Sequence, residues 1–417
     1  MNVLHVNNVD LPGRRFNGYD LMSDLRSRGV EGRQAVLTKH SADPAVFSLC
    51  SDPGDEELQS RISAVEQRHS INNILFPWGR LLAESPEFAR ADVVHYHLIH
   101  NRMVSLYELP SLFSRKPSVW TFHDRWPFTG HCIYPKGCER WLEGCGECPS
   151  LAAGFPLQEG GTDSMWRLKK RIYADLDVDI VVASDFMLDM ARRSPLTSHF
   201  EHVHCIPFGI RTEAFLAEAE KAASRHILGI PEDDFVLLCR STESELKGLR
   251  YIVDALRLRP PRRATTVLTV DQRGLVRHLP GGFRVKDMGW IDDPELYPRV
   301  LSACDVLVMP SLEEAFGLMA VEAMGAGRPV ICFEGTSLPS VSHAPECGIA
   351  VPRGDVAALR EAIDRLSGDS HEVAVRGEVG RSVVAQHYGH ERYLDEMADL
   401  YGAMLSRAER GPRGTSI

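Results

Sequence analysis

Two glutamates in the segment 305–340 stand at the start of a predicted helix. Glu314 falls in a polar loop, and Glu322 falls about one and a half turns into a helix that begins at Gly317. The free N–H groups and the dipole at a helix start favour a diphosphate. One carboxylate can bind a ribose diol, and the other can hold the hydroxyls of a sugar. The alternative is an amphipathic helix with a surface glutamate.

Two cations follow another apolar run, in the segment 237–256. Arg240 ends the run, and Lys247 precedes a helix that opens at Gly248. Two positive charges after one strand suit a diphosphate leaving group, whose negative charge grows during transfer. Taken alone, such cations would face the solvent. Because the acidic pair is also present, we expect them to bind a diphosphate.

Histidines gather at the ends of two apolar runs. His123, followed by Asp124, is placed to hydrogen-bond a sugar or a reacting phosphate, with a local structural role as the alternative. Strand alternation puts His95 and His97 on one face, and His100 follows them. No carboxylate or third ligand at a suitable spacing is evident, so hydrogen bonding is favoured over a metal site.

A glycine-containing loop follows the first apolar run and precedes a helix. Gly18 would let the backbone approach a ligand closely, and Asn17 and Arg15 are weaker candidates for the same site. A plain turn between a strand and a helix is the alternative.

Eight of the ten cysteines fall into two groups. Four lie in one loop of 17 residues with the spacing C-x5-C-x6-C-x2-C: Cys132, Cys138, Cys145 and Cys148. They are candidates for a structural zinc site, and reduced cysteines that pack the loop are the alternative. Four others lie within or beside apolar runs and are expected to be buried: Cys205, Cys239, Cys304 and Cys332.

The segment PSLEEAFGLMAVEAMGAGRPV resembles the EX7E signature of the retaining GT-B glycosyltransferases of family 4, with seven residues between Glu314 and Glu322. The resemblance implies that Glu322 holds the ribose of the donor. It also implies that Glu314, with the backbone of Ala315, Phe316 and Gly317, contacts the transferred sugar and phosphate.

The resemblance extends from about residue 2 to about residue 405. It implies that Arg240 and Lys247 stabilise the leaving diphosphate, that His123 acts at the reacting centre, and that Gly18 lies near the donor phosphates. The run WPFTG, followed by a cysteine, CER-W and CG-CP, resembles a branch of family 4 that builds bacterial exopolysaccharides.

Strands that alternate with helices must position these residues. The predicted strands are short apolar runs at 3–6, 92–97, 118–123, 179–184, 235–240, 264–270, 305–310 and 329–333. The predicted helices include 248–258, 295–304 and 317–327. Apolar strands alternating with helices indicate parallel sheets covered on both faces. We therefore expect two doubly wound α/β domains that face an interdomain cleft, which is the Rossmann-like pair of the GT-B fold.

The predicted boundary is a linker at about 207–216, where a proline and a glycine punctuate the chain. We expect an acceptor-binding domain at 1–206 and a donor-binding domain at 216–386. The segment 387–417 is expected to form a helix that crosses back to the first domain, followed by a tail.

Composition excludes several classes of protein. A net charge of −10 argues against nucleic acid as a main partner. No apolar run approaches the ~20 residues of a membrane span, and the first residues do not form a signal peptide, so a cytoplasmic location is expected. A helical run beside Trp166 (Arg167, Lys169, Lys170 and Arg171) is a candidate for peripheral contact with the inner face of the membrane. A solvated helix face is the favoured alternative.

Together with these patterns, the resemblance to family 4 implies a retaining transferase that moves a hexosyl group from a nucleotide-diphospho-sugar to a hydroxyl. The acceptor is a saccharide, a lipid-linked compound or a small molecule. Catalysis is expected to need no metal or other cofactor, because Arg240 and Lys247 supply the positive charge. The alternatives are a GT-B nucleotide-sugar epimerase or hydrolase, and a non-catalytic protein that binds nucleotide sugars.

Overall fold

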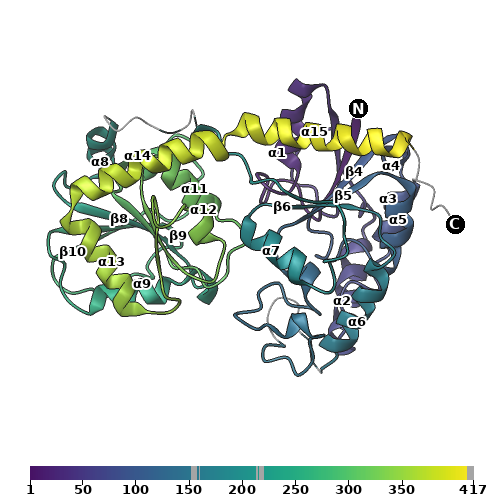
Figure 1. The fold of residues 1–417 in the computed structure, drawn as a ribbon, viewed down its shortest axis with the longest axis horizontal. Coiled ribbons are helices and arrows are strands. Elements are labelled where there is room, and N and C mark those ends of the chain that lie inside the picture. The colour runs from purple at the N-terminus through teal and green to yellow at the C-terminus, as the bar shows by residue number, and fades with distance from the viewer. Residues whose placement is uncertain (152–156, 159, 213–214, 216–219, 411–417) are drawn as a thin grey trace. The chain divides into compact units, whose positions relative to one another are not determined.

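The computed structural model of the protein describes residues 1–151, 157–158, 160–212, 215 and 220–410. The chain forms two compact units (Figure 1). The first unit comprises Met1–Ile206 and the C-terminal residues from Tyr393 onward, and the second comprises Pro207–Arg392. Residues 213–214 and 216–219, in and just beyond the predicted linker, lie outside the described residues, as do residues 411–417 of the predicted tail.

A parallel seven-stranded sheet forms the centre of the first unit, in the order β3-β2-β1-β4-β5-β6-β7. Its strands are β1 (Asn2–Val6), β2 (Glu31–Val36), β3 (Val46–Ser48), β4 (Val93–Tyr96), β5 (Ser118–Phe122), β6 (Asp179–Val182) and β7 (Val203–Cys205). β1 and β4 are neighbours, although the chain first runs outward from β1 to β2 and β3. The direction of winding therefore reverses between these two strands.

The helices of the first unit connect these strands. They are α1 (Tyr19–Asp24), α2 (Asp55–Arg68), α3 (Trp78–Glu84), α4 (Pro86–Arg90), α5 (Leu109–Arg115), α6 (Thr162–Tyr173), α7 (Asp185–Arg193) and, at the end of the chain, α15 (His390–Glu409). Within the described ranges, no helix combines the length and the apolar character that crossing a bilayer requires.

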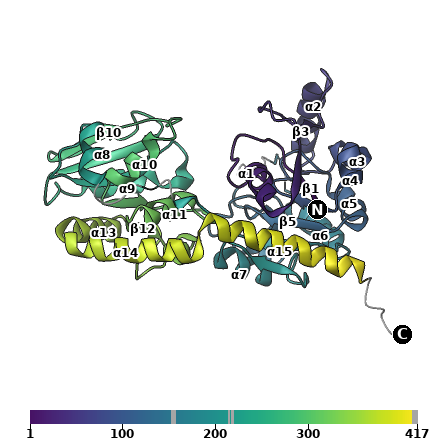
Figure 2. The same ribbon diagram turned by 90° about the horizontal axis from the view of Figure 1, so that it is seen from above.

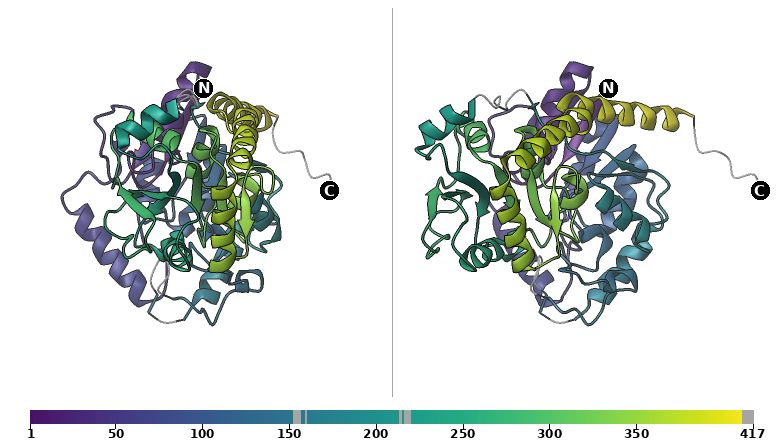
Figure 3. Two further views of the ribbon diagram at one scale, coloured as in Figure 1. Left: turned by 90° about the vertical axis from the view of Figure 1, so that its left-hand side faces the viewer. Right: turned by 60° about the vertical axis from the view of Figure 1, so that its left-hand side comes forward.

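A parallel six-stranded sheet forms the centre of the second unit, in the order β10-β9-β8-β11-β12-β13. Its strands are β8 (Phe235–Ser241), β9 (Thr265–Asp271), β10 (Phe283–Asp287), β11 (Val306–Met309), β12 (Val330–Phe333) and β13 (Ile349–Val351). Its helices are α8 (Lys221–Leu228), α9 (Leu249–Arg257), α10 (Leu296–Ala303), α11 (Leu318–Gly325), α12 (Leu338–Val341), α13 (Val356–Gly368) and α14 (Ser370–His387). Figure 3 shows α13 and α14, in yellow-green, outside the strands of this sheet.

Apolar strands with helices between them produce this doubly wound architecture, as the sequence predicts. The eight predicted strands are observed as β1, β4, β5, β6, β8, β9, β11 and β12. The remaining strands were not predicted: β2, β3, β7, β10 and β13. They lie toward the sheet margins, and β2 and β10 mix charged with apolar residues.

The buried-cysteine prediction is correct for three of its four members. Cys239, Cys304 and Cys332 are fully buried in the second unit. Cys205 is partly exposed, because it ends the edge strand β7 of the first sheet. An edge strand has a neighbour on only one side, and its last residue is therefore more open to solvent.

The C-terminal helix α15 packs on the first unit (Figure 2), which it joins from Tyr393 onward. The buried Tyr401 hydroxyl lies 2.6 Å from Nδ1 of His95 on β4, and Arg407 forms an ion pair with Asp179 on β6. A buried hydrogen bond and an ion pair thus attach the end of the chain to the central strands of this unit.

We expect Tyr401→Phe to lower the free energy of unfolding by about 1–3 kcal/mol, because it leaves a buried His95 nitrogen without its partner. The measurement is denaturant unfolding followed by tryptophan fluorescence. Tyr107→Phe is the matched control, because Tyr107 is 62% exposed and the change should stay within about 0.5 kcal/mol. Equal losses in the two variants would show that the buried bond contributes nothing specific.

Candidate functional site

Apart from Gly18, the predicted donor-binding residues lie within or after the two central strands of the second sheet. β8 and β11 are neighbours there, although β9 and β10 separate them along the chain. Arg240 is part of β8 and Lys247 follows it, whereas Glu314 follows β11. In open parallel sheets, ligands bind beyond the carboxyl ends of the strands where the winding reverses. The fold therefore places these side chains where a ligand is expected.

An ion pair joins the two loops at this position. Lys247 Nζ lies 2.8 Å from Glu314 Oε2, with both side chains mostly buried. The backbone N–H of Leu312 donates to the carbonyl of Leu246 at 2.8 Å. Gly248 is in the left-handed region (φ 74°), and a Cβ there would collide with the carbonyl oxygen of Pro310. The loop after β8 therefore lies directly against the loop after β11.

Hydrogen bonds and a ring contact fix the peptide around Ala315. Ser337 Oγ donates to the carbonyl oxygens of Glu314 and Phe316, at 3.1 and 3.0 Å. The buried Phe316 ring lies edge-on to another ring of the same unit, Tyr388, 5.8 Å between centroids. The peptide that is predicted to contact sugar and phosphate is therefore held rigidly.

Helix α11 begins directly after this peptide. Gly317 is its N-cap (φ 105°) and provides no side-chain cap for the first turn. One and a half turns later, the buried Glu322 accepts a hydrogen bond from the Tyr297 hydroxyl at 2.9 Å. Tyr297 was not predicted as a site residue, although it lies in the predicted helix 295–304. It orients the carboxylate that the sequence assigns to the ribose.

Arg240 has a different partner from Lys247. Its Nε lies 2.7 Å from Oδ2 of Asp271, at the end of the neighbouring strand β9. Asp271 was not predicted, and it adopts a left-handed backbone (φ 90°), which is uncommon for a residue with a side chain. Such conformations cluster at functional sites. The two predicted cations therefore lie at the carboxyl end of the central strand β8, and each is paired with a different carboxylate.

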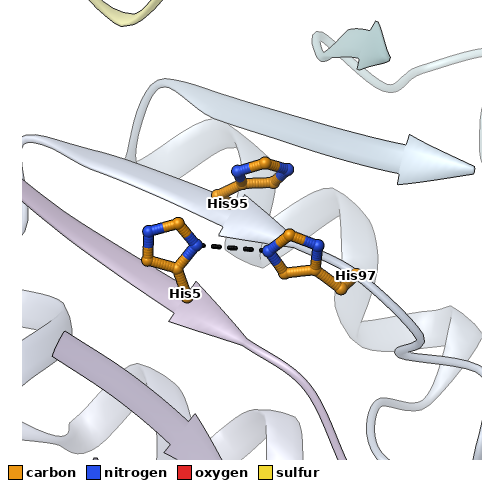
Figure 4. A group of neighbouring side chains, drawn as sticks. All are labelled: His5, His95 and His97. Carbon is orange, nitrogen blue, oxygen red and sulfur yellow. Dashed lines mark hydrogen bonds between the residues drawn. The ribbon is translucent and has the colours of Figure 1, made fainter. Parts of the chain in front are cut away.

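Histidines of the first unit form a cluster beside the corresponding reversal between β1 and β4. Those on β1 and β4 are buried, and His123, which follows β5, is partly exposed. The register of these strands sets His5 opposite His95. His5 Nδ1 lies 3.2 Å from His97 Nε2 (Figure 4), and His97 Nδ1 lies 3.1 Å from His123 Nε2. The sequence analysis found no third ligand beside His95 and His97, and this was wrong. Ligand atoms of His5, His95 and His97 all lie within 4.8 Å of one another.

Burial keeps these imidazoles neutral. It lowers the pKa of His5 and that of His123 to about 3, and it lowers the pKa of His97 and that of His95 well below their ordinary value. His95 stacks on His97 at a centroid distance of 4.0 Å. Its two nitrogens lie 2.6 Å from the Tyr401 hydroxyl and 2.7 Å from the hydroxyl of Thr121. Both nitrogens of His95 therefore have hydrogen-bond partners, and the choice between hydrogen bonding and a metal site stays a prediction.

His100 and Asp124 form a separate buried pair. His100 Nε2 lies 2.9 Å from Asp124 Oδ2, and its ring stacks on Trp126 at 4.7 Å. Although burial acts to raise the pKa of Asp124, His100 and the backbone N–H of Trp126 lower it. His100 therefore anchors the residue that follows His123.

The loop that contains Gly18 lies against the histidine cluster. Gly18 is in the left-handed region (φ 93°), and a Cβ there would lie 2.5 Å from His97 Nε2 and 2.8 Å from His5 Nδ1. The side-chain amide of Asn17 donates to three carbonyls of its own loop, so it acts structurally. Arg15 is exposed. Gly18 is thus required where two imidazoles meet.

The predicted basic run on α6 is partly buried, and in this respect the prediction was wrong. Lys169 is fully buried, donates to the carbonyls of Trp126 and Thr129 at 2.8 and 2.9 Å, and lies 3.3 Å from the Trp126 ring centre. Trp166 is also buried. Helical periodicity turns these two residues inward, so only Arg167, Lys170 and Arg171 remain for a surface contact.

Two of the four cysteines of the predicted zinc loop, Cys132 and Cys145, lie near this lysine. Burial raises the pKa of Cys132 to about 12 and also raises that of Cys145, while the Lys169 ammonium acts in the opposite direction. Among the described residues, these sulfurs do not form a group of three or more within 4.8 Å of one another. The zinc site stays a prediction.

Part of the second unit is similar to a known family. Residues 232–369 match the family Glycosyl transferases group 1. An MMP alpha-(1->4)-mannosyltransferase of Mycolicibacterium hassiacum is 26% identical over 256 residues, which are 60% of this chain and 58% of the relative. A D-inositol 3-phosphate glycosyltransferase of Arthrobacter sp. is 31% identical over 52% of this chain and 55% of the relative. The chain thus spans somewhat more than half the length of these curated relatives.

Solved structures share the fold over nearly the whole chain. The sucrose-phosphate synthase of Thermosynechococcus elongatus superposes with a TM-score of 0.68 at 18% identity, over 98% of this chain and 100% of its own. HepE of Anabaena, in complex with UDP and glucose, gives 0.64 at 16% identity over 97% and 100%. The chain therefore has the GT-B fold of two Rossmann-like domains, and its residues 232–369 match the family Glycosyl transferases group 1.

Proposed function

We propose that this protein is a retaining glycosyltransferase that moves a hexosyl group from a nucleotide-diphospho-sugar to an acceptor hydroxyl. The observation that carries the proposal is the Lys247–Glu314 ion pair at the reversal between β8 and β11, inside the group 1 domain. Next to the uncapped N-terminus of α11, Lys247 can bind a phosphate and Glu314 can bind the hydroxyls of a sugar.

The second unit offers each part of such a donor a separate partner. The Tyr297-oriented carboxylate of Glu322 suits the two hydroxyls of a ribose. The N-terminus of α11 and the side chains of Arg240 and Lys247 suit the diphosphate, while Glu314 and the rigid peptide before Gly317 suit the sugar. Glu314 holds Lys247 in place before the donor binds, which lowers the reorganisation needed during transfer.

In the proposed reaction, the bond from the anomeric carbon to the diphosphate oxygen breaks, and a bond to the acceptor oxygen forms on the same face. The acceptor proton passes to the departing phosphate, so no protein nucleophile is required. Positive charge from Arg240 and Lys247 stabilises the leaving group, and catalysis then needs no metal ion. Within the first unit, we assign His123 to catalysis and Gly18 to donor binding.

The comparisons support a sugar nucleotide as donor. HepE binds UDP and glucose by its title, and the two relatives named above transfer mannose or act on D-inositol 3-phosphate by their names. The acceptor class of this protein is a saccharide, a lipid-linked compound or a small molecule with a free hydroxyl.

The first test is a thermal-shift and product-release screen with UDP, GDP, ADP and dTDP sugars, without acceptor and with EDTA. We expect one nucleotide series to raise the melting temperature and to release its nucleoside diphosphate slowly. At a donor concentration 100 times the Kd, the stabilisation should be about 2.7 kcal/mol. An activity that EDTA abolishes and Mg²⁺ restores would contradict the assignment of Arg240 and Lys247.

The same screen separates the alternatives. A nucleotide-sugar epimerase would return an isomerised nucleotide sugar, which chromatography of the products detects. A non-catalytic binding protein would show the thermal shift without any product. Absence of a shift with every nucleotide, in folded protein, would contradict the donor site itself.

Variants test the donor residues individually. We expect Lys247→Met to lower kcat about 100- to 1000-fold, because a preorganised charge on the leaving group is lost. Glu322→Gln should instead raise the donor KM about 10- to 100-fold, because two hydrogen bonds to a carboxylate weaken. Glu361→Gln, on the exposed face of α13, is the control and should leave both constants unchanged. Unaltered kinetics in both site variants would refute the site.

We also propose that Cys132, Cys138, Cys145 and Cys148 hold a structural zinc ion. The buried Lys169 beside two of them would offset the negative charge of four thiolates. We expect about one zinc per chain by elemental analysis, lost in Cys145→Ser together with thermal stability. Purified protein without zinc and with four reactive thiols would show that these cysteines only pack the loop.

A further inference from the structure

The cluster between β1 and β4 contains a continuous chain of three imidazoles. His5 Nδ1 contacts His97 Nε2 at 3.2 Å, and His97 Nδ1 contacts His123 Nε2 at 3.1 Å. The first two ring planes differ by 16° and the second two by 27°. The rings are therefore close to parallel, and His97 uses both of its nitrogens to link the other two.

Neutral imidazoles in such a chain are coupled in their tautomers. A neutral imidazole has one N–H donor and one acceptor nitrogen. Because His97 is bonded through both nitrogens, it must donate on one side and accept on the other. Only two arrangements satisfy both contacts. Either all three rings carry the proton on Nδ1, or all three carry it on Nε2.

The buried end of the chain decides between the two arrangements. His5 Nε2 is buried and has no hydrogen-bond partner among the residues that the structure describes. If the rings carried the proton on Nε2, this atom would be an orphaned N–H donor, and buried orphaned N–H groups are rare in proteins. If they carry it on Nδ1, only a lone pair is left without a partner.

We propose that His5 and His97 hold His123 in its Nδ1–H tautomer, so that His123 offers the reacting centre a hydrogen-bond donor and not a base. A donor suits an oxygen of the sugar or the phosphate. This inference rests on the proposed function for its kinetic consequence, but the tautomer itself can be measured without any turnover.

The surroundings prevent the chain from rearranging. His95 stacks on His97 at 4.0 Å and is itself fixed through both nitrogens by Tyr401 and Thr121. Gly18 leaves the space in which His5 and His97 meet, which any Cβ would fill. Gly18 therefore acts as a positioning residue through the histidines and does not have to touch a ligand.

A metal ion is the other chemistry that three close histidines offer. The contacts of the cluster argue against it, because both nitrogens of His95 already have partners and its ring lies face to face with that of His97. A metal ion that binds His95 would have to replace one of these two hydrogen bonds.

The direct test is nitrogen NMR of protein labelled with ¹⁵N-histidine, with His123→Gln used to assign the signals. Protonated and bare nitrogens of a neutral ring differ in chemical shift. We expect Nδ1 of His123 to carry the proton and Nε2 to be bare from about pH 6 to about pH 8, since burial keeps the ring neutral. A proton on Nε2, or a mixture of tautomers, would overturn the proposal.

Two variants break the chain at different bonds. His97→Phe removes both bonds while keeping a ring, and Gly18→Ala places a methyl group between His5 and His97. In each we expect a mixed His123 tautomer and a kcat lowered about tenfold, with the donor KM changed less than about threefold. Gly29→Ala is the control, because it has the same left-handed backbone (φ 72°) with nothing near its Cβ, and it should alter neither quantity.

The outcomes separate this inference from the proposed function. A fixed Nδ1–H tautomer of His123 in a protein that uses no nucleotide sugar would support the coupling of the three imidazoles. It would refute the proposed transferase function. Normal transfer with the His123 tautomer unchanged in both variants would overturn the proposed coupling of the three imidazoles. It would leave the proposed transferase function intact. Stoichiometric metal that is lost in His5→Phe but kept in Cys145→Ser would show a metal site and overturn the proposal.

Discussion

Parallel pairing of the strands is the constraint on which both candidate sites depend. When all strands of a sheet point the same way, all of their carboxyl ends meet at one edge, and helices must cover both faces. Where the winding reverses, two neighbouring strands send their loops in opposite directions and leave room between them. The reversal at β8 and β11 holds Lys247 and Glu314, and the reversal at β1 and β4 holds the histidines. One topological rule thus accounts for two chemically different sites.

The two sites differ chemically because their side chains differ in exposure to solvent. In the second unit, Lys247, Glu314 and Arg240 keep some contact with solvent, so they can remain charged while paired. In the first unit, His5, His95 and His97 are buried, and a proton on any of these three would be a charge without water around it. The second unit can therefore present charged groups to a diphosphate. The first unit can present neutral hydrogen-bonding groups.

The sequence was most informative where local pattern and chemistry coincide. Glu314 and Glu322 could be predicted as a pair because the spacing, the preceding strand and the helix start all lie within one short segment. Tyr297 and Asp271 could not be predicted, because each meets its partner only through the packing of separate elements. The same holds for His5, which lies 92 positions before His97 and reaches it through strand pairing. The donor-binding role of Gly18 stays a prediction, and the two imidazoles beside it were not predicted, since a left-handed glycine does not reveal what approaches it.

The sequence by itself determined the alternation of strands and helices, the parallel sheets that follow from it, and the identity of the charged residues after β8 and β11. Burial of apolar strands and helix periodicity are local properties, and the order of residues encodes them directly. Tertiary structure decided which side chains meet, because that depends on strand order and register between distant segments. It turned Lys169 and Trp166 inward, gave Arg240 and Lys247 separate carboxylates, and joined His5, His97 and His123 into one hydrogen-bonded chain.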